Sequence, residues 1–142
     1  MADDAQPSPL ANLITEAREG RLNVRMEPEE FAKIDHECEN FKELVIREIQ
    51  RTMTEISQIT TWGIGDHAGS QLTSAPTMAQ RFREKAQGGP DSFYDVLEEH
   101  YRIVEDIRLL HQEVRNRFMG QDGQWAARFQ AELTSLEQGP QR

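Results

Sequence analysis

The stretch PEEFAKIDHECENFKELVIREIQRTMTEISQIT, residues 28–60, decides the fold class of this chain. Its apolar residues recur in steps of three or four, which is the period of an α-helix with one apolar face. They are Phe31, Ile34, Cys38, Phe41, Val45, Ile49, Met53, Ile56 and Ile59. Pro28 suits a first helical turn, and no glycine or proline follows before residue 61. The pattern predicts one helix from about residue 28 to 61, roughly 50 Å long at ~1.5 Å per residue.

A second long helix is predicted by FYDVLEEHYRIVEDIRLLHQEVRNRF, residues 93–118. Ser92 can cap its start, and Gly120 is expected to end it. Its apolar stripe is Phe93, Leu97, Tyr101 (or His100), Val104, Ile107, Leu110, Val114 and Phe118. Shorter amphipathic helices are predicted at 74–87, with Ser74 as the cap, at 123–137, and from about Pro9 to Gly20.

Two long helices with one apolar stripe each predict an all-α fold, namely an antiparallel helical hairpin with short accessory helices. Residues 1–27 form an N-terminal arm with a short helix, 28–120 the hairpin, and 121–142 a short amphipathic helix and tail. A hairpin alone buries little surface, so we expect a four-helix bundle completed by dimerisation, with a monomer closed by the short helices as the alternative. The residues expected to pack are Phe31, Ile34, Phe41, Val45, Ile49, Met53, Ile56, Leu97, Val104, Ile107, Val114 and Phe118.

The break between the long helices contains the sequence WGIG, residues 62–65. Gly63 and Gly65 allow the backbone to reverse, and Trp62 can fold back over the end of the apolar seam. We therefore interpret Trp62, Gly63 and Gly65 as a turn motif.

Composition narrows the possible partners. The 142 residues carry a formal net charge of −9, which disfavours binding to nucleic acid or to anionic lipid. No apolar run approaches the ~20 residues of a membrane span, so no membrane insertion is expected. The first residues do not resemble a Sec signal peptide. The single cysteine excludes an intrachain disulfide and fits a cytoplasmic protein.

The order of these features resembles the WXG (Esx-like) proteins of type VII secretion. That family has a long helix, a W-x-G tip, a second long helix and a downstream Y-x-x-x-D/E motif. Here Trp62 to Gly65 stand at the tip and Tyr101 to Glu105 follow, with Tyr94 to Glu98 as an alternative match. The resemblance covers roughly residues 28–118. The chain is longer than the family norm, and Ile64 stands where the motif places glycine.

The resemblance implies a protein without enzymatic activity that pairs with another helical hairpin, as a homodimer or a heterodimer. It also implies export without a Sec signal, with Tyr101 and Glu105 read by a secretion ATPase. Their i, i+4 spacing places both on one helix face. Alternatively, Tyr101 packs at the rim of the seam and Glu105 is solvated.

The sequence offers little for catalysis, metals or cofactors. The histidines are His36, His67, His100 and His111. None has a glutamate three residues earlier, as a di-iron helical bundle would need. Cys38 lies within the first stripe and is expected to be a core residue. We therefore predict no catalytic, metal-binding or cofactor-binding residue.

Two further interpretations remain open. The basic segment RFREK, residues 81–85, could dock an acidic partner or simply solubilise the surface. The whole chain could also be a cytosolic adaptor or chaperone that masks the helices of a larger secreted or toxin-like partner. Localisation is therefore expected to be cytoplasmic, or secreted by a type VII route.

Overall fold

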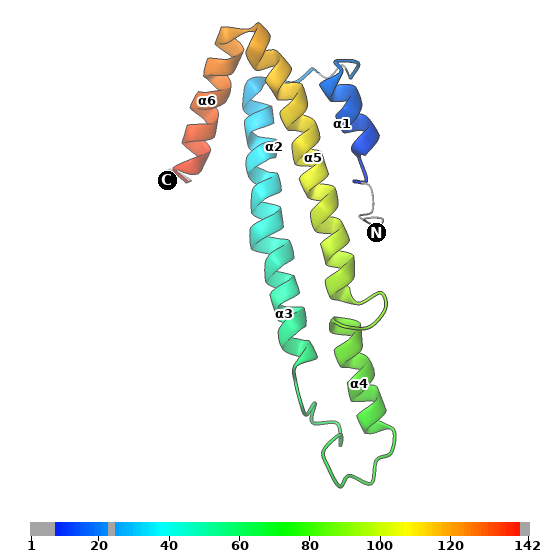
Figure 1. Cartoon of the computed structure of the whole chain (residues 1–142). Coiled ribbons are helices and arrows are strands. Elements are labelled where there is room, and N and C mark those ends of the chain that lie inside the picture. Colours follow the sequence, from blue (N-terminus) through cyan, green and yellow to red (C-terminus); the bar gives the residue numbers. More distant parts are fainter. Residues whose placement is uncertain (1–7, 23–24, 140–142) are drawn as a thin grey trace. The chain divides into compact units, whose positions relative to one another are not determined.

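The computed structural model describes residues 8–22 and 25–139, and within these ranges it contains helices and no strand. The predicted all-α fold class is confirmed. The helices are α1 (Ala11–Arg18), α2 (Pro28–Asn40), α3 (Arg47–Ser57), α4 (Ala75–Ala86), α5 (Phe93–Gln121) and α6 (Gly123–Glu137), and a π-helical segment, Phe41–Ile46, connects α2 to α3 (Figure 1). Residues 1–7 of the predicted N-terminal arm and residues 140–142 of the predicted tail lie outside the described residues.

The chain divides into two compact units. Unit 1 contains the described residues up to Lys42 and those from Arg102 onward, so it holds α1, α2, α6 and the C-terminal part of α5. Unit 2 runs from Glu43 to Tyr101 and holds α3, α4 and the start of α5.

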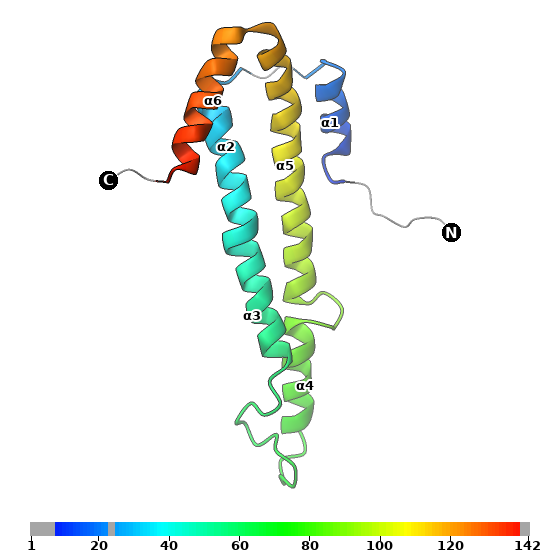
Figure 2. The same cartoon turned by 60° about the vertical axis from the view of Figure 1, so that its left-hand side comes forward.

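Unit 1 has an aromatic core built around Trp125 of α6. The Trp125 ring lies 5.5 Å from Phe31 at 66°, and it stacks on Phe118 at 5.4 Å and on Phe129 at 5.8 Å. Helix α6 folds back after α5 and lies beside α2 (Figure 2). The apolar residues of α6 therefore cover the start of α2 and bury Phe31 almost completely.

The turn between α5 and α6 is a single residue, Asp122. Its carboxylate accepts hydrogen bonds from the backbone N–H groups of Gln124 at 2.9 Å and Trp125 at 3.2 Å, which satisfies two donors at the start of α6. The prediction that Gly120 ends the preceding helix is wrong, because Gly120 lies inside α5 and Asp122 makes the turn.

Polar contacts join α2 to α5 in unit 1. Arg108 donates to Asp35 at 3.1 Å and lies 3.0 Å from Glu39, while the Lys42 ammonium pairs with Glu39 and Glu105. Burial lowers the pKa of Lys42, but its bonds to Glu105 and Glu39 outweigh that effect and raise it. A buried ammonium thus remains charged between two helices.

Polar contacts also join α3 to α5 in unit 2. Arg47 donates to Glu98 at 2.8 Å, and the Gln50 amide donates to Glu98 at 2.8 Å and to the Tyr94 carbonyl at 3.2 Å. The Tyr101 hydroxyl donates to Glu43 at 2.9 Å. Positions on α5 fall as those on the partner helix rise, so the two helices run antiparallel within this unit.

The π-helical segment corrects the predicted apolar stripe. A π turn contains one more residue than an α turn, so the residues that follow it face the neighbouring helix one position later than a constant helical period predicts. Lys42, Ile46 and Gln50 are 4%, 1% and 2% exposed. The predicted packing residues Phe41, Val45 and Ile49 are instead 45%, 40% and 40% exposed.

Two predicted helix boundaries also differ from the structure. The first long helix ends at Ser57 rather than near residue 61, and the Ser57 hydroxyl donates to the Thr54 carbonyl at 2.6 Å at this end. Ser74 precedes α4 as expected, but its side chain makes no capping hydrogen bond. The side chain of Ser92 does accept one, from the Asp95 N–H at 3.2 Å.

We expect Trp125→Ala to lower the free energy of unfolding by about 3–5 kcal/mol, because it leaves a cavity among three aromatic rings. Urea denaturation followed by far-UV circular dichroism measures this loss. The control is Met78→Ala on α4, whose side chain is exposed and whose loss should cost under about 0.5 kcal/mol. Equal effects of the two substitutions would contradict the assignment of Trp125 to the core.

Candidate functional site

The loop between α3 and α4 holds the Trp62 turn motif and is organised by one carboxylate. Asp66 accepts a hydrogen bond from the Trp62 backbone N–H at 2.7 Å. This bond, followed by those from the N–H groups of Asp66, Ile64 and Gly63, holds the pKa of the Asp66 carboxyl below its usual value. The bond from the Trp62 N–H joins residues four positions apart, so Asp66 helps to fix the path of the loop, while its Oδ1 has no hydrogen-bond partner among the described residues.

Gly63 and Gly65 both have positive φ, 76° and 89°, in the region that favours glycine. A Cβ at Gly65 would also overlap the Leu72 side chain, while a Cβ at Gly63 would meet no atom. The two glycines of the motif are therefore needed for different reasons. Gly63 supplies backbone freedom alone, whereas Gly65 also supplies space.

Arg83 of α4 holds the other end of this loop. Its guanidinium donates to the carbonyl of Ile59 at 2.6 Å and to that of Thr60 at 2.9 Å, and it lies 4.0 Å from the Asp66 carboxylate. These two carbonyls follow the end of α3 and need partners outside the helix. The RFREK segment thus supplies a structural contact that the sequence did not reveal.

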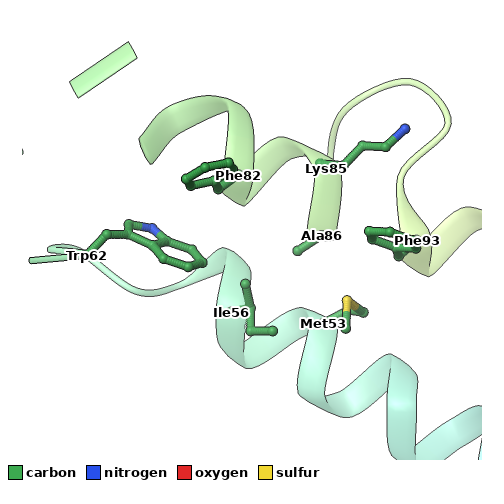
Figure 3. Close-up of a pocket in the computed structure, with 7 residues that line it drawn as sticks. All are labelled: Met53, Ile56, Trp62, Phe82, Lys85, Ala86 and Phe93. Atoms are coloured by element: carbon green, nitrogen blue, oxygen red, sulfur yellow. The ribbon is translucent and has the colours of Figure 1, made fainter. Parts of the chain in front are cut away.

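Trp62 packs over an apolar pocket in unit 2. Its ring lies 5.5 Å from that of Phe82 at 56°, and the two form one side of a cavity of about 320 Å³ (Figure 3). The remaining lining residues are Met53, Ile56, Lys85, Ala86 and Phe93. The sequence pattern places Met53 and Ile56 on the same stripe as Val45 and Ile49, so the pocket continues the exposed stripe within unit 2.

The other predicted packing residues differ in how deeply they are buried. Phe31 and Val114 are buried in the core of unit 1, and Phe118 packs against that core. Ile34, Leu97, Val104 and Ile107 are half-buried.

The two residues of the predicted secretion signal lie in different units. Tyr101 belongs to unit 2, where the guanidinium carbon of Arg47 lies 3.7 Å from the centre of its ring. Glu105 belongs to unit 1 and pairs with Lys42 and, at 3.9 Å, with Arg108. Both side chains already have partners in the chain, so a receptor that reads them must compete with these contacts.

The alternative pair, Tyr94 and Glu98, lies on α5 before Tyr101 and Glu105. Glu98 accepts from both Arg47 and Gln50, and the Tyr94 side chain is half-buried. The acid of each match is thus engaged by a neighbouring helix, and neither pair stands apart as the more accessible.

Cys38 is half-buried and so is not the core residue that the sequence predicted. Burial raises the pKa of its thiol, and the nearby Asp35 carboxylate raises it further. Among the described residues, no group of three or more His, Cys, Asp or Glu side chains could hold a metal ion. No helix in the described part of the chain is long and apolar enough to cross a membrane.

We expect Asp66→Asn to loosen the Trp62 loop at neutral pH, because a neutral amide accepts backbone hydrogen bonds less strongly than a carboxylate. A lowered pKa means that the carboxylate stabilises the folded loop above its unfolded pKa, and this stabilisation is lost as pH falls through the folded pKa. Amide hydrogen exchange at residues 62–66 should therefore become faster in the variant at pH 7, while the two proteins should converge in acid.

The control for this experiment is Asp91→Asn, which changes an exposed carboxyl outside the loop. It should leave exchange at residues 62–66 unaltered. Unchanged exchange in Asp66→Asn at neutral pH would show that the carboxylate does not organise the loop.

Comparison of the chain with protein-family models, with curated proteins and with solved structures gives no match in any of the three.

Proposed function

We propose that this chain is a non-enzymatic helical interaction protein that presents an apolar face of unit 2 to a second helical hairpin. Its sequence resemblance points to a WXG-like substrate or partner of a type VII secretion system. The observation that carries the proposal is the exposure of the stripe that begins at Val45 and Ile49. The alternative within the same architecture is a cytosolic adaptor that masks the helices of a larger protein.

The exposed stripe supports a protein partner on energetic grounds. Val45 and Ile49 are exposed, and Met53 and Ile56 follow them on the same helix face in steps of four and three, where they are half-buried beside α4. Removing apolar surface from water yields about 25 cal/mol for each Å². Exposed apolar residues that form a continuous face, rather than scattered single residues, are typical of interaction sites.

The contacts between α3 and α5 explain why Val45 and Ile49 are left exposed in unit 2. Arg47 and Gln50 form polar contacts with Glu98 and the Tyr94 carbonyl. These contacts use the side of α3 that the π-helical segment turns toward α5. In the proposed hairpin, polar side chains pair α3 with α5, and the exposed Val45 and Ile49 remain available for another hairpin.

The partner is either a second copy of the chain or a different helical hairpin. A second copy brings another −9 charge, but surface charges farther apart than about 8 Å are largely screened at physiological salt. Burial of two apolar stripes in a four-helix bundle favours association. We expect this favourable free energy to exceed the unfavourable free energy of the screened repulsion. The solution mass of the purified chain distinguishes self-association from dependence on another protein.

We expect Ile49→Glu to abolish association, because a carboxylate buried in an apolar interface is strongly disfavoured. Light scattering after size exclusion should show a dimer for the original chain and a monomer for the variant. Arg51→Glu is the matched control, since Arg51 is exposed and lies on a different side of α3. A dimer that survives Ile49→Glu would contradict the proposed face.

If the partner is a different hairpin, the original chain alone should be monomeric. The same pair of variants is then tested for co-purification with that hairpin from the source cells. Loss with Ile49→Glu and retention with Arg51→Glu is the expected result. Equal retention would again exclude this face.

We expect the double substitution Tyr101→Ala with Tyr94→Ala to abolish export if the chain is a type VII substrate. Comparison of culture supernatant with cell lysate measures export. The phenylalanine version of the double variant is the control for packing, because it keeps both rings. Undiminished export of the alanine variant would contradict the signal, and a chain that never leaves the cell would favour the adaptor.

A further inference from the structure

The apolar pocket of unit 2 has a volume and a charged lining residue, Lys85, that helix packing alone does not require. It lies where the C-terminal part of α3, the loop after it, the C-terminal half of α4 and the first residue of α5 meet (Figure 3). Its volume of about 320 Å³ lies at the small end of ligand pockets, which range from about 300 to 1,000 Å³. The pocket therefore suits one small ligand or one slender chain.

The lining of this pocket defines the buried part of a ligand. The rings of Trp62, Phe82 and Phe93 and the side chains of Met53 and Ile56 give it an almost wholly apolar surface. The Trp62 Nε1–H is a buried donor without a partner in the described part of the chain, but a ligand with several polar groups would leave the others unpaired, and an unpaired polar group is costly to bury. An alkyl chain meets this condition, whereas an extended peptide backbone or a sugar does not.

Lys85 supplies the one charged group among the lining residues. Figure 3 shows its side chain leaving α4 away from Ile56 and Met53, with the ammonium toward the loop that precedes Phe93. The ammonium donates to the Asp91 carbonyl at 3.0 Å, and among the described residues it forms no ion pair. A neutral carbonyl leaves its remaining donors available to an anion at the edge of the pocket.

The charge of α4 favours the same kind of ligand. Although the chain carries −9 in total, this helix has three cations, Arg81, Arg83 and Lys85, and one carboxylate, Glu84. Arg83 is engaged by loop carbonyls, so Lys85 is the cation next to the apolar lining. The helix thus presents local positive charge beside an alkyl-sized pocket.

We propose that the pocket binds a single-chain aliphatic carboxylate, a medium-chain fatty acid. The alkyl chain lies among Met53, Ile56, Trp62, Phe82 and Phe93, and the carboxylate accepts hydrogen bonds from the Lys85 ammonium. The small volume excludes a two-chain lipid from full burial. The site needs only unit 2, and it shares Met53 and Ile56 with the face proposed for the partner hairpin.

The primary experiment is calorimetric titration of the full chain with sodium laurate, below the concentration at which laurate forms micelles. We expect saturable binding of one laurate per chain, and weaker binding of octanoate and palmitate. Quenching or a shift of Trp62 fluorescence in a Trp125→Phe variant gives a second readout, because the chain has two tryptophans. Binding that does not saturate would overturn the proposal.

Paired variants test the two parts of the site. Lys85→Met should weaken laurate binding about tenfold, as expected for loss of one charge-assisted hydrogen bond, while Lys85→Arg should retain it. Dodecanol should bind Lys85→Met and the original chain equally. If Lys85→Met binds laurate as tightly as the original chain does, the carboxylate contact is wrong.

Phe82→Ala should weaken laurate and dodecanol alike, because it removes one wall of the pocket. The matched control is Val45→Ala, which shortens an exposed apolar side chain on the same unit outside the pocket. Equal loss in the two variants would show that laurate binds the exposed stripe and would overturn the assignment to the pocket.

Discussion

The π-helical segment Phe41–Ile46 is the constraint on which the rest of unit 2 depends. One additional residue in a helical turn rotates everything that follows relative to the neighbouring helix. After this turn, Ile46 and Gln50 are buried, while Val45 and Ile49 remain exposed. Polar contacts of Arg47 and Gln50 with α5 thereby take the place of the apolar contacts predicted for Val45 and Ile49. The apolar stripe becomes a surface feature instead of a core feature.

This exchange leaves the two units with different sources of stability. Unit 1 buries Phe31, Trp125 and Phe129 in one aromatic core. The buried hydrophobic side chains of unit 2 are mostly small, with Ala79 and Ala86 of α4 among them. Partly exposed ion pairs such as Arg47 with Glu98 contribute only about 0–1 kcal/mol each. Unit 2 is therefore the less well-packed part, and regions that bind partners are often drawn from such parts.

Much of the helical content follows directly from the sequence pattern. The bounds of α4 and α6 lie close to the predicted ranges, because glycine-containing breaks and strong periodicity delimit both segments. The π turn could not be predicted, since a residue count with a constant period contains no signal for one wider turn. The role of Asp122 escapes a sequence prediction because Gly120 is the more familiar helix stop.

The candidate site, like the fold, was predicted from the sequence only in part. Trp62 and its two glycines stand out in the sequence. The carboxylate that binds the Trp62 N–H, Asp66, carries no such signal and is recognised only once the loop is folded. The sequence of the RFREK segment indicates only a charged surface. Its members instead have separate structural roles, because Phe82 lines the pocket and Arg83 binds loop carbonyls. Such roles depend on contacts with residues about twenty positions away or more, which no local pattern contains.

The division of unit 1 into two segments has a consequence for biosynthesis. Unit 2 is one uninterrupted stretch, so it can fold as soon as residue 101 has left the ribosome. Helix α2, by contrast, is synthesised early but finds Trp125 only after α6 has emerged. Until then Phe31 lacks its contact with Trp125, and its α5 neighbours His111 and Phe118 are synthesised only after unit 2. The nascent chain therefore exposes the apolar start of α2 throughout the synthesis of unit 2, which makes this segment a natural substrate for a ribosome-associated chaperone.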